Sequence, residues 1–461
     1  MTLIEAYLLF EKAKTRGMNN TINRYLIFLI SIVLLLSCSN NSIKENIQFL
    51  GEIEWTKTLG GAQEDFAFSV IQTLDGNLMV FGYTSSTDGD IIDKTVQEND
   101  YWLIKLTMDG SIIWSKTYGG SGEDVGEKVI QTNDGGYAIV GYSMSSDGDA
   151  SNNEGAHDNW LLKLDASGNI LWEKSFGFSG HDHAYSVIQT EDGGFFITGF
   201  LDVTASGGGG NSKTQNTLHG VGEFWCHKLN RNGETIWRKY FGGSSNDRSY
   251  DAVQANDGGF VVTGFSESND FDISNSKGSY DIWVIKLDIN GNLVWEKSLG
   301  GAEIDQSRAI TKTSDNGYIV AGNSFSVDGD ISSNLGSSDF FLIKLNDNGN
   351  IVWSKNFGGS NFDYATAINA TSDGFVVSGY SRSSDNQLTS NYGDNDFWVI
   401  KINNQGNLIW QKSFGGSNLD FAFDAIETLE GEIIVVGETE SNDFDILENK
   451  GLKDVLVIKI K

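Results

Sequence analysis

Residues 291–301 read GNLVWEKSLGG, and their pattern of a Gly, three residues, a Trp, one residue and a Lys occurs seven times in the chain. Successive tryptophans of the pattern are 59, 58, 65, 58, 58 and 57 residues apart. A near-constant period of this length is typical of repeat proteins, in which each unit buries its apolar face against its neighbours. The seven residues are Trp55, Trp114, Trp172, Trp237, Trp295, Trp353 and Trp410.

One repeat, residues 124–174, contains four short runs with strand character and no run that resembles an amphipathic helix. Asp-Gly-Gly and Ser-Gly-Asn sequences between the runs supply the positive φ angles that tight hairpins need. Four antiparallel strands per unit, repeated radially, form the blade of a β-propeller. A parallel β-solenoid is the alternative, but its rungs are shorter and lack two hairpin signals per repeat.

The two ends of the repeat region predict how the ring closes. The last unit has three strands and stops at Lys461 without its Trp strand, whereas residues 51–60 form a Trp strand with nothing before it. Joining the two completes a seventh blade and leaves no long open sheet edge. We therefore expect an all-β chain whose residues 51–461 form a seven-bladed β-propeller of four-stranded antiparallel blades, closed by the N-terminal strand.

These repeats resemble the bacterial seven-bladed β-propeller repeat family. The unit NDFWVIKINNQGNLIWQKSFGGSNLDFAFDAIETLEGEIIVVGETES, residues 395–441, carries a strand ending in Lys and an apolar residue, a Gly-Asn turn and a strand leading to Gly-Gly-Ser. The resemblance covers about residues 51–461. It implies an exported binding or scaffold protein and transfers no catalytic residue.

The N-terminal region carries an export signal. Residues 25–36 (YLIFLISIVLLL) form an apolar run of 12 residues, preceded by Arg24 and followed by Ser37 and Cys38. The run is short for a membrane span but suits a signal peptide, and residues 35–38 look like a lipobox. We expect residues 1–37 to be a signal peptide, with Met18 as an alternative start, Cys38 to be lipidated, and residues 38–50 to be a polar tether. An uncleaved anchor helix is the alternative.

Charge limits the classes of partner. The chain carries a formal net charge of −30, and the part after residue 38 is more acidic still. Such a domain repels nucleic acid and anionic head groups. We expect a monomeric domain at the cell envelope, as an outer-membrane lipoprotein of undecided face, that binds a protein or a glycan. Cys226 is then the single thiol of the mature chain and is expected to lie buried in a strand.

Acidic residues gather in loops that a propeller places on one face. One Asp per blade precedes the inner strand, and five loops between second and third strands carry Asp-x-Asp. Converging carboxylates suit calcium, whereas the competing interpretation is that they bond backbone amides and shape the loops. The candidate calcium residues are Asp88, Asp90, Asp147, Asp149, Asp270, Asp272, Asp328, Asp330, Asp443 and Asp445.

The repeat is broken between the second and third blades. All five histidines lie there, as do the sequence GFSGHDHAY and the insertion that lengthens one period to 65 residues. His181, His183, His219 and Asp202 are candidate ligands for zinc or another transition metal, although the spacing matches no established signature. Histidines of a variable surface loop are the alternative, and His227 is expected to pack within its strand.

Two functions remain open from the sequence. One is a lipid-anchored binding or scaffold propeller whose ligand, a glycan or a protein, binds on the acidic face. The other is an envelope enzyme, a glycan-active hydrolase or lyase, with its site at the irregular blades. The sequence contains no Gly-x-Ser-x-Gly, P-loop or His-Glu-x-x-His motif, which favours the first.

Overall fold

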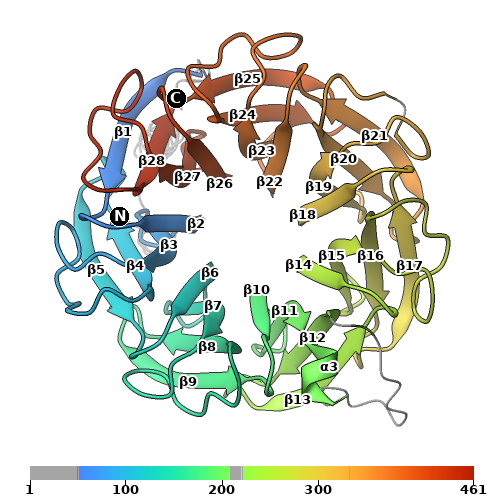
Figure 1. Ribbon diagram of the computed structural model, residues 1–461, viewed down its shortest axis with the longest axis horizontal. Helices are drawn as coiled ribbons and strands as arrows, with labels where there is room; N and C mark the ends of the chain where they lie inside the picture. The colour runs from blue at the N-terminus through green and yellow to red at the C-terminus, as the bar shows by residue number, and fades with distance from the viewer. Residues whose placement is uncertain (1–48, 50, 208–219, 221, 332) are drawn as a thin grey trace, which may run out of the picture. The chain divides into compact units, whose positions relative to one another are not determined.

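Seven four-stranded antiparallel sheets follow one another around a central axis (Figure 1). The computed structural model describes residues 49, 51–207, 220, 222–331 and 333–461, and residues 51–461 form one compact unit. This architecture is the seven-bladed β-propeller that the repeat period predicts.

Each blade runs from an inner strand to an outer strand in chain order. The first three blades are β2 (Asp65–Gln72), β3 (Leu78–Thr84), β4 (Asp100–Leu106), β5 (Ile112–Tyr118); β6 (Asp124–Gln131), β7 (Tyr137–Ser143), β8 (Asp158–Leu164), β9 (Ile170–Phe176); and β10 (His183–Gln189), β11 (Phe195–Leu201), β12 (Glu223–Leu229), β13 (Thr235–Phe241). The next three are β14 (Asp247–Gln254), β15 (Phe260–Ser266), β16 (Asp281–Leu287), β17 (Leu293–Leu299); β18 (Asp305–Lys312), β19 (Tyr318–Ser324), β20 (Asp339–Leu345), β21 (Ile351–Phe357); and β22 (Asp363–Ala370), β23 (Gly374–Ser381), β24 (Asp396–Asn403), β25 (Leu408–Phe414). The seventh is β26 (Asp420–Glu427), β27 (Ile433–Thr439), β28 (Asp454–Ile460) and β1 (Ile53–Leu59).

The ring closes where β1 pairs with β28, at the position of the hairpin that joins the third and fourth strands in the other blades. β1 pairs antiparallel with β28, Ile53 opposite Ile460, and Glu52 and Lys461 exchange backbone hydrogen bonds of 3.1 and 3.0 Å. Gly51 has φ 70°, close to the 79° of Gly110 in the hairpin between β4 and β5. The chain therefore begins its propeller at the turn that joins the third and fourth strands in the other blades, which confirms the predicted closure.

The core lies between neighbouring blades rather than within one sheet. Third-strand aromatics are fully buried and pack against the preceding blade, as Trp398 does against Phe340 and Trp160 against Tyr101, with ring centroids 4.4 and 4.7 Å apart. A sheet that is apolar on both faces must be covered on both, and stacking in a ring satisfies this for all seven.

Cys226 and His227 lie in the interior of β12, and neither is exposed. The His227 ring packs on Trp225, with centroids 4.0 Å apart, and burial lowers the pKa of His227 to about 3. Both expectations from the sequence, a buried thiol and a strand-packed histidine, are confirmed.

Every inner strand contains a β-bulge at the same place. The pairing register with the second strand shifts by one residue, for example between Ala67 and Ser69 in β2 and between Ser307 and Ala309 in β18. A bulge leaves one residue unpaired and re-aims its side chain. As a result the residue at the shift and the residue after it both line the cavity on the axis of the ring in five blades, whereas β2 and β10 contribute only Phe68 and Tyr185.

Candidate metal centre

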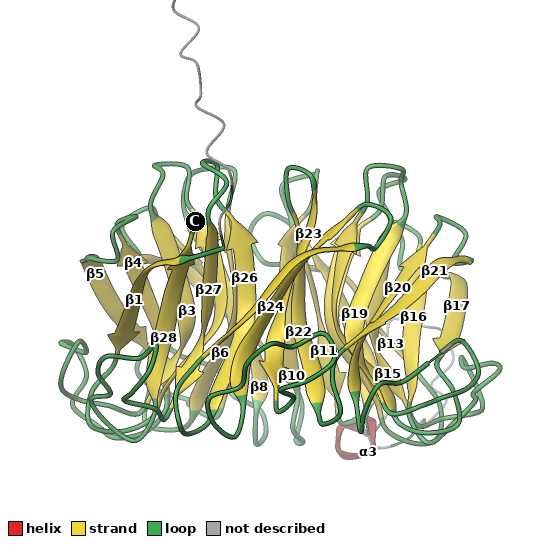
Figure 2. Cartoon of the chain, turned by 90° about the horizontal axis from the view of Figure 1, so that it is seen from above, coloured by secondary structure: helices red, strands yellow, loops and turns green. Residues whose placement is uncertain are grey.

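The long loops all lie on one face of the propeller. Figure 2 shows the short hairpins along one rim and the longer loops along the other. The long set comprises the loops between second and third strands, for example residues 85–99. The loops between blades lie on the same face, as the sequence predicted, but they are as short as the hairpins opposite: five residues separate Leu59 from Asp65, and five separate Gln72 from Leu78. The expectation that both loop sets are longer than the hairpins is therefore wrong for the loops between blades. The one helix in the described part of the chain, α3 (Val203–Ser206), also lies on this long-loop face.

The periodic Asp that precedes each inner strand has a structural role. Asp65, for example, is fully buried, and its carboxylate accepts hydrogen bonds from the Gly61 amide at 2.8 Å, from Ser86 at 2.9 Å and from Thr84. It ties the loop between blades to the loop after the second strand, and equivalent bonds recur in other blades. The interpretation of this ring as structural is confirmed.

Each of these aspartates also faces a second buried acid from the preceding blade. We call these the inter-blade acid pairs; around Gly415, for instance, Asp396 and Asp420 approach from two sides. One oxygen of Asp396 has no hydrogen-bond partner, and burial, with Asp420 adding to it, raises the pKa of Asp396 to about 7. The pairs are Asp65/Asp454, Asp124/Asp100, Asp182/Asp158, Asp247/Glu223, Asp305/Asp281, Asp363/Asp339 and Asp420/Asp396.

The Asp-x-Asp residues bind backbone amides. The first Asp accepts from the loop between blades, as Asp88 does from Ala62 at 2.7 Å and Asp147 from Ser121 at 2.7 Å. The second accepts from the glycine at the start of that loop, as Asp90 does from Gly60 at 3.0 Å. This is the loop-shaping role that competed with calcium binding, and calcium at these loops stays a prediction.

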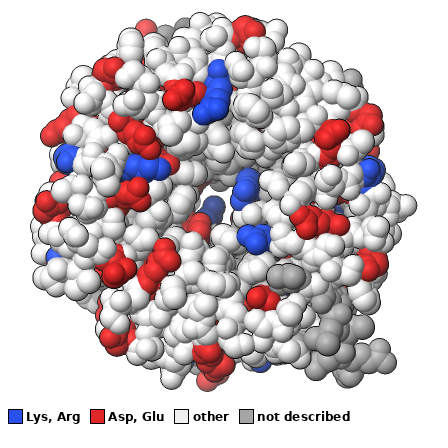
Figure 3. Space-filling view, viewed as in Figure 1, with Lys and Arg blue, Asp and Glu red and all other residues white. Residues whose placement is uncertain are grey.

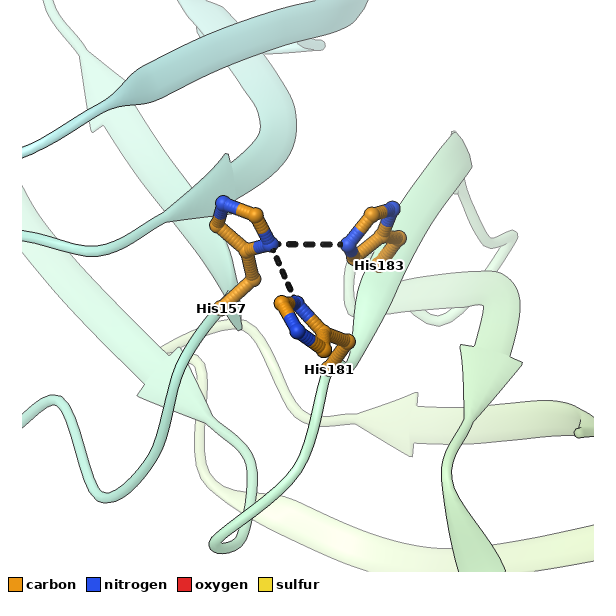
Figure 4. Close-up of side chains that lie close together, drawn as sticks. All are labelled: His157, His181 and His183. Carbon is orange, nitrogen blue, oxygen red and sulfur yellow. Dashed lines mark hydrogen bonds between the residues drawn. The ribbon is translucent and has the colours of Figure 1, made fainter. Parts of the chain in front are cut away.

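Three histidines meet where the repeat is broken. His157 precedes β8, His181 lies in the loop between the second and third blades, and His183 begins β10. The Nδ1 atom of His157 lies 2.7 Å from Nδ1 of His181 and 3.1 Å from Nε2 of His183 (Figure 4). One nitrogen from each ring falls within 4.8 Å of the others. Tetrahedral zinc with bonds of ~2.0–2.1 Å holds nitrogens about 3.4 Å apart, so little adjustment is needed.

In His157 and His183, the ring nitrogen that points away from the cluster lies within hydrogen-bond distance of another side chain. Nε2 of His157 lies 3.3 Å from Oε2 of Glu123, whose other oxygen accepts a 3.0 Å bond from Asn99. Nδ1 of His183 lies 3.2 Å from the Tyr185 hydroxyl. When Glu123 accepts the Nε2 hydrogen, Nδ1 of His157 keeps its lone pair toward the cluster. This is the tautomer control that surrounds metal-binding histidines.

The surroundings keep the imidazoles of His183 and His157 neutral. Burial lowers the pKa of His183 to about 3, with His157 and His181 adding to the effect. Burial also lowers the pKa of His157, although Glu123 opposes it. Tyr142 stacks on His183 with centroids 3.9 Å apart. With the lone pair of Nδ1 of His157 facing the cluster, His181 and His183 donate the two hydrogen bonds that it accepts. A transition metal binds deprotonated ligands and would replace these two hydrogens.

The sequence predicted two of the three histidines. Asp202 lies elsewhere: it begins α3, and its carboxylate accepts the Ala205 amide at 2.9 Å as the helix N-cap. His219 lies outside the described residues, as does Cys38. The third histidine of the cluster, His157, was not among the predicted ligands. In this structure the residue before a third-strand acid forms a β-bridge with the residue before the next inner-strand Asp, as Tyr280 does with Ile304 and His157 with His181. That rule, applied along the repeats, identifies His157.

The fold and this cluster define a seven-bladed propeller with a three-histidine metal-type site at one blade junction. No protein-family model matches the chain, and neither does any curated protein sequence. Among solved structures it is similar to Sqt1 from Chaetomium thermophilum, at 10% identity over 90% of this chain and 99% of that one, with a TM-score of 0.46. The Neurospora crassa Pan2 WD40 domain gives 9% identity over 88% and 96%, with a TM-score of 0.47. Likenesses this distant concern the fold alone.

No helix in the part of the chain that the structure describes is long and apolar enough to cross a membrane.

Proposed function

We propose that the chain is a lipid-anchored binding propeller of the cell envelope, which holds a zinc ion at His157, His181 and His183 and binds a glycan or protein ligand beside it on the long-loop face. The observation that supports it most is the three-histidine cluster. It occurs once among the described blades, at the irregular junction, whereas the periodic aspartates of the loops bind backbone amides of the blades. Variable loops on a rigid scaffold are where binding usually resides.

Zinc is expected to stabilise the native chain but not the His157→Ala variant. A ligand that binds only the folded state raises the free energy of unfolding by about 2.7 kcal/mol at a hundredfold excess over its dissociation constant. Thermal melting with zinc, calcium or a chelator measures this. Glu123→Gln should weaken zinc binding about 10–100-fold, because Glu123 orients His157 without touching the metal.

The matched controls are His219→Ala and Asp202→Asn. Neither should change the zinc effect if the ligands are His157, His181 and His183, since the amide of an Asn at 202 can still cap α3. Retention of the zinc effect in His157→Ala, or its loss in His219→Ala, contradicts this ligand set. A stabilisation by calcium in all variants would instead support the Asp-x-Asp loops as a cation site.

Cys38→Ala is expected to release the protein from the membrane fraction. The apolar run of residues 25–36 and the residues before Cys38 support lipidation there, and lipoprotein processing attaches enough acyl chains for stable anchoring. Fractionation of cells that express each form, with metabolic labelling by a palmitate analogue, measures it. An unlabelled variant that still sediments with membranes supports the anchor helix instead.

A second candidate is an envelope enzyme that cleaves glycans. The observation in its favour is that three protein ligands leave the fourth position of a tetrahedral metal open, as in catalytic zinc sites, and His181 is exposed to solvent. Cleavage of envelope polysaccharides by the zinc-loaded chain, absent in His157→Ala, would favour this candidate; binding without cleavage favours the first.

A further inference from the structure

The residues at the central channel differ from blade to blade. At the two bulge positions that face it, the pairs of residues are Phe68–Ser69, Glu127–Lys128, Tyr185–Ser186, Tyr250–Asp251, Arg308–Ala309, Thr366–Ala367 and Phe423–Asp424. The Asp that begins the repeat and the residues packed behind the bulge stay nearly constant. The packing behind the bulge therefore does not dictate the channel residues, which leaves them free to form a ligand site.

These side chains surround a cavity of 330 Å³ that includes Phe68, Glu127, Tyr185, Arg308 and Phe423 in its wall. The volume is that of a small-molecule site, about 300–1,000 Å³ in proteins generally. Viewed from the long-loop face, basic side chains lie beside and inside the central opening together with an acidic patch at its edge, whereas most acidic side chains lie further out (Figure 3).

The positive charge of Lys128 is balanced by two acids within the channel. Desolvation lowers its pKa, but Asp251 and Asp424 outweigh this and raise it. Both aspartates accept hydrogen bonds, Asp251 from the Ser186 hydroxyl at 2.8 Å and Asp424 from the Val70 amide at 3.1 Å. Lys128 with its two acids is thus a fixed part of the wall.

The Arg308 guanidinium has no hydrogen bond or ion pair with another described residue. It is exposed to the channel and lies over the Tyr250 ring, 3.9 Å from the centroid. Glu127, whose pKa is affected by the Arg308 charge, also has no hydrogen bond among the described residues. Burial raises the pKa of Glu127 to about 8, against the effect of Arg308, so at pH 7 its carboxyl is mostly protonated. The N–H donors of Arg308 are therefore free to bind a ligand in the cavity.

Aromatic rings flank this charge. Tyr185 lies 4.9 Å from Tyr250, and Phe68 meets Phe423 edge-on at 4.7 Å, all measured between ring centroids. Aromatic faces that are partly open to a cavity offer stacking surfaces for a flat ligand ring or for the C–H face of a sugar. A guanidinium fork beside them matches a carboxylate in two parallel hydrogen bonds.

We infer that the central channel binds a small carboxylate that carries a ring, with the carboxylate on Arg308 and the ring between the tyrosine pair and the phenylalanine pair. Two sources share this chemistry, a uronic acid and an aromatic acid. The inference rests on the proposed role as a binding propeller, but not on the metal centre.

The test is isothermal titration calorimetry of the full chain at pH 7 with sodium glucuronate and sodium benzoate, and with glucose and benzamide as neutral counterparts. At least one acid should bind, and its neutral counterpart should bind at least tenfold more weakly. Arg308→Gln should lower the affinity for that acid at least tenfold, the loss of one charge-assisted contact. Arg382→Gln, the same charge change outside the cavity wall, should leave it within twofold, and near-ultraviolet circular dichroism verifies that both variants are folded.

Glucuronate and benzoate distinguish the two sources. If neither acid binds, if the neutral compounds bind equally well, or if Arg308→Gln binds like the native chain, the inference is wrong. Titrations repeated with His157→Ala separate the two sites: acid binding that persists without zinc binding supports the channel alone. Loss of acid binding in that variant would show that the channel is not an independent site.

Discussion

Deletion of residues 51–60 is expected to destabilise the propeller by several kcal/mol. The deletion removes β1, which buries Leu59, half-buries Trp55 and forms the ladder with β28. The Trp55 indole also donates a 3.2 Å hydrogen bond to Met108 of the next blade. Burial of one large apolar side chain contributes about 1.5–3 kcal/mol, and the exposed edge of β28 invites association between chains. Chemical denaturation and light scattering of residues 51–461 and 61–461 measure both effects.

A circular permutant is the control for this deletion. Five residues separate Leu106 from Ile112, whereas Lys461, Gly51 and Glu52 fill three of the equivalent positions between Ile460 and Ile53. Residues 51–60 placed after Lys461 through a two-residue linker should therefore complete an ordinary hairpin and restore stability. A deletion chain as stable as residues 51–461, or a permutant no better than the deletion, would contradict closure by β1.

The free energy of unfolding is expected to fall as the pH rises from 5 to 8. Burial raises the pKa of Asp65, Asp158 and Asp454 to about 6 and that of Asp182 to about 7. A carboxyl whose pKa is raised in the folded state stabilises that state at low pH, and the contribution is lost as the pH passes through the folded pKa. Histidines with lowered pKa values, such as His183, act in the opposite direction but are fewer than the inter-blade acid pairs.

Asp396→Asn isolates one inter-blade acid pair. At pH 5 the native carboxyl is protonated and Asn replaces it with little change; at pH 8 Asn removes the repulsion from Asp420. Each pKa unit corresponds to 1.36 kcal/mol, so the variant should gain about 2 kcal/mol relative to the native chain between the two pH values. Urea unfolding at both pH values measures it.

Asp134→Asn is the matched control for this pair. Asp134 is exposed at the surface and is paired with Lys163, and its pKa of about 2 keeps it ionised at both pH values. Its effect on stability should therefore be the same at pH 5 and pH 8. If Asp396→Asn behaves in the same way, the inter-blade acid pairs are not coupled to pH.

The sequence alone was sufficient for the fold, because the fold depends on contacts within a repeat and between adjacent repeats. A period of about 58 residues, two hairpin signals per repeat, a last unit without its Trp strand and a single Trp strand at residues 51–60 predicted seven closed blades. The same locality explains why the buried positions of Cys226 and His227 could be predicted. Every blade repeats the environment of the others, so one pattern describes them all.

The sites depend on contacts between blades and on a local break in strand alternation, which only the tertiary structure decided. His157 and His181 meet because a β-bridge joins the loops of two adjacent blades. Asp202, which the sequence assigned to the same metal site, begins a helical turn instead. Glu127 and Arg308 both face the channel because a bulge in each inner strand turns two consecutive residues inward. A period of two along the strand assigns such neighbours to opposite faces, so the channel could not be derived from the pattern.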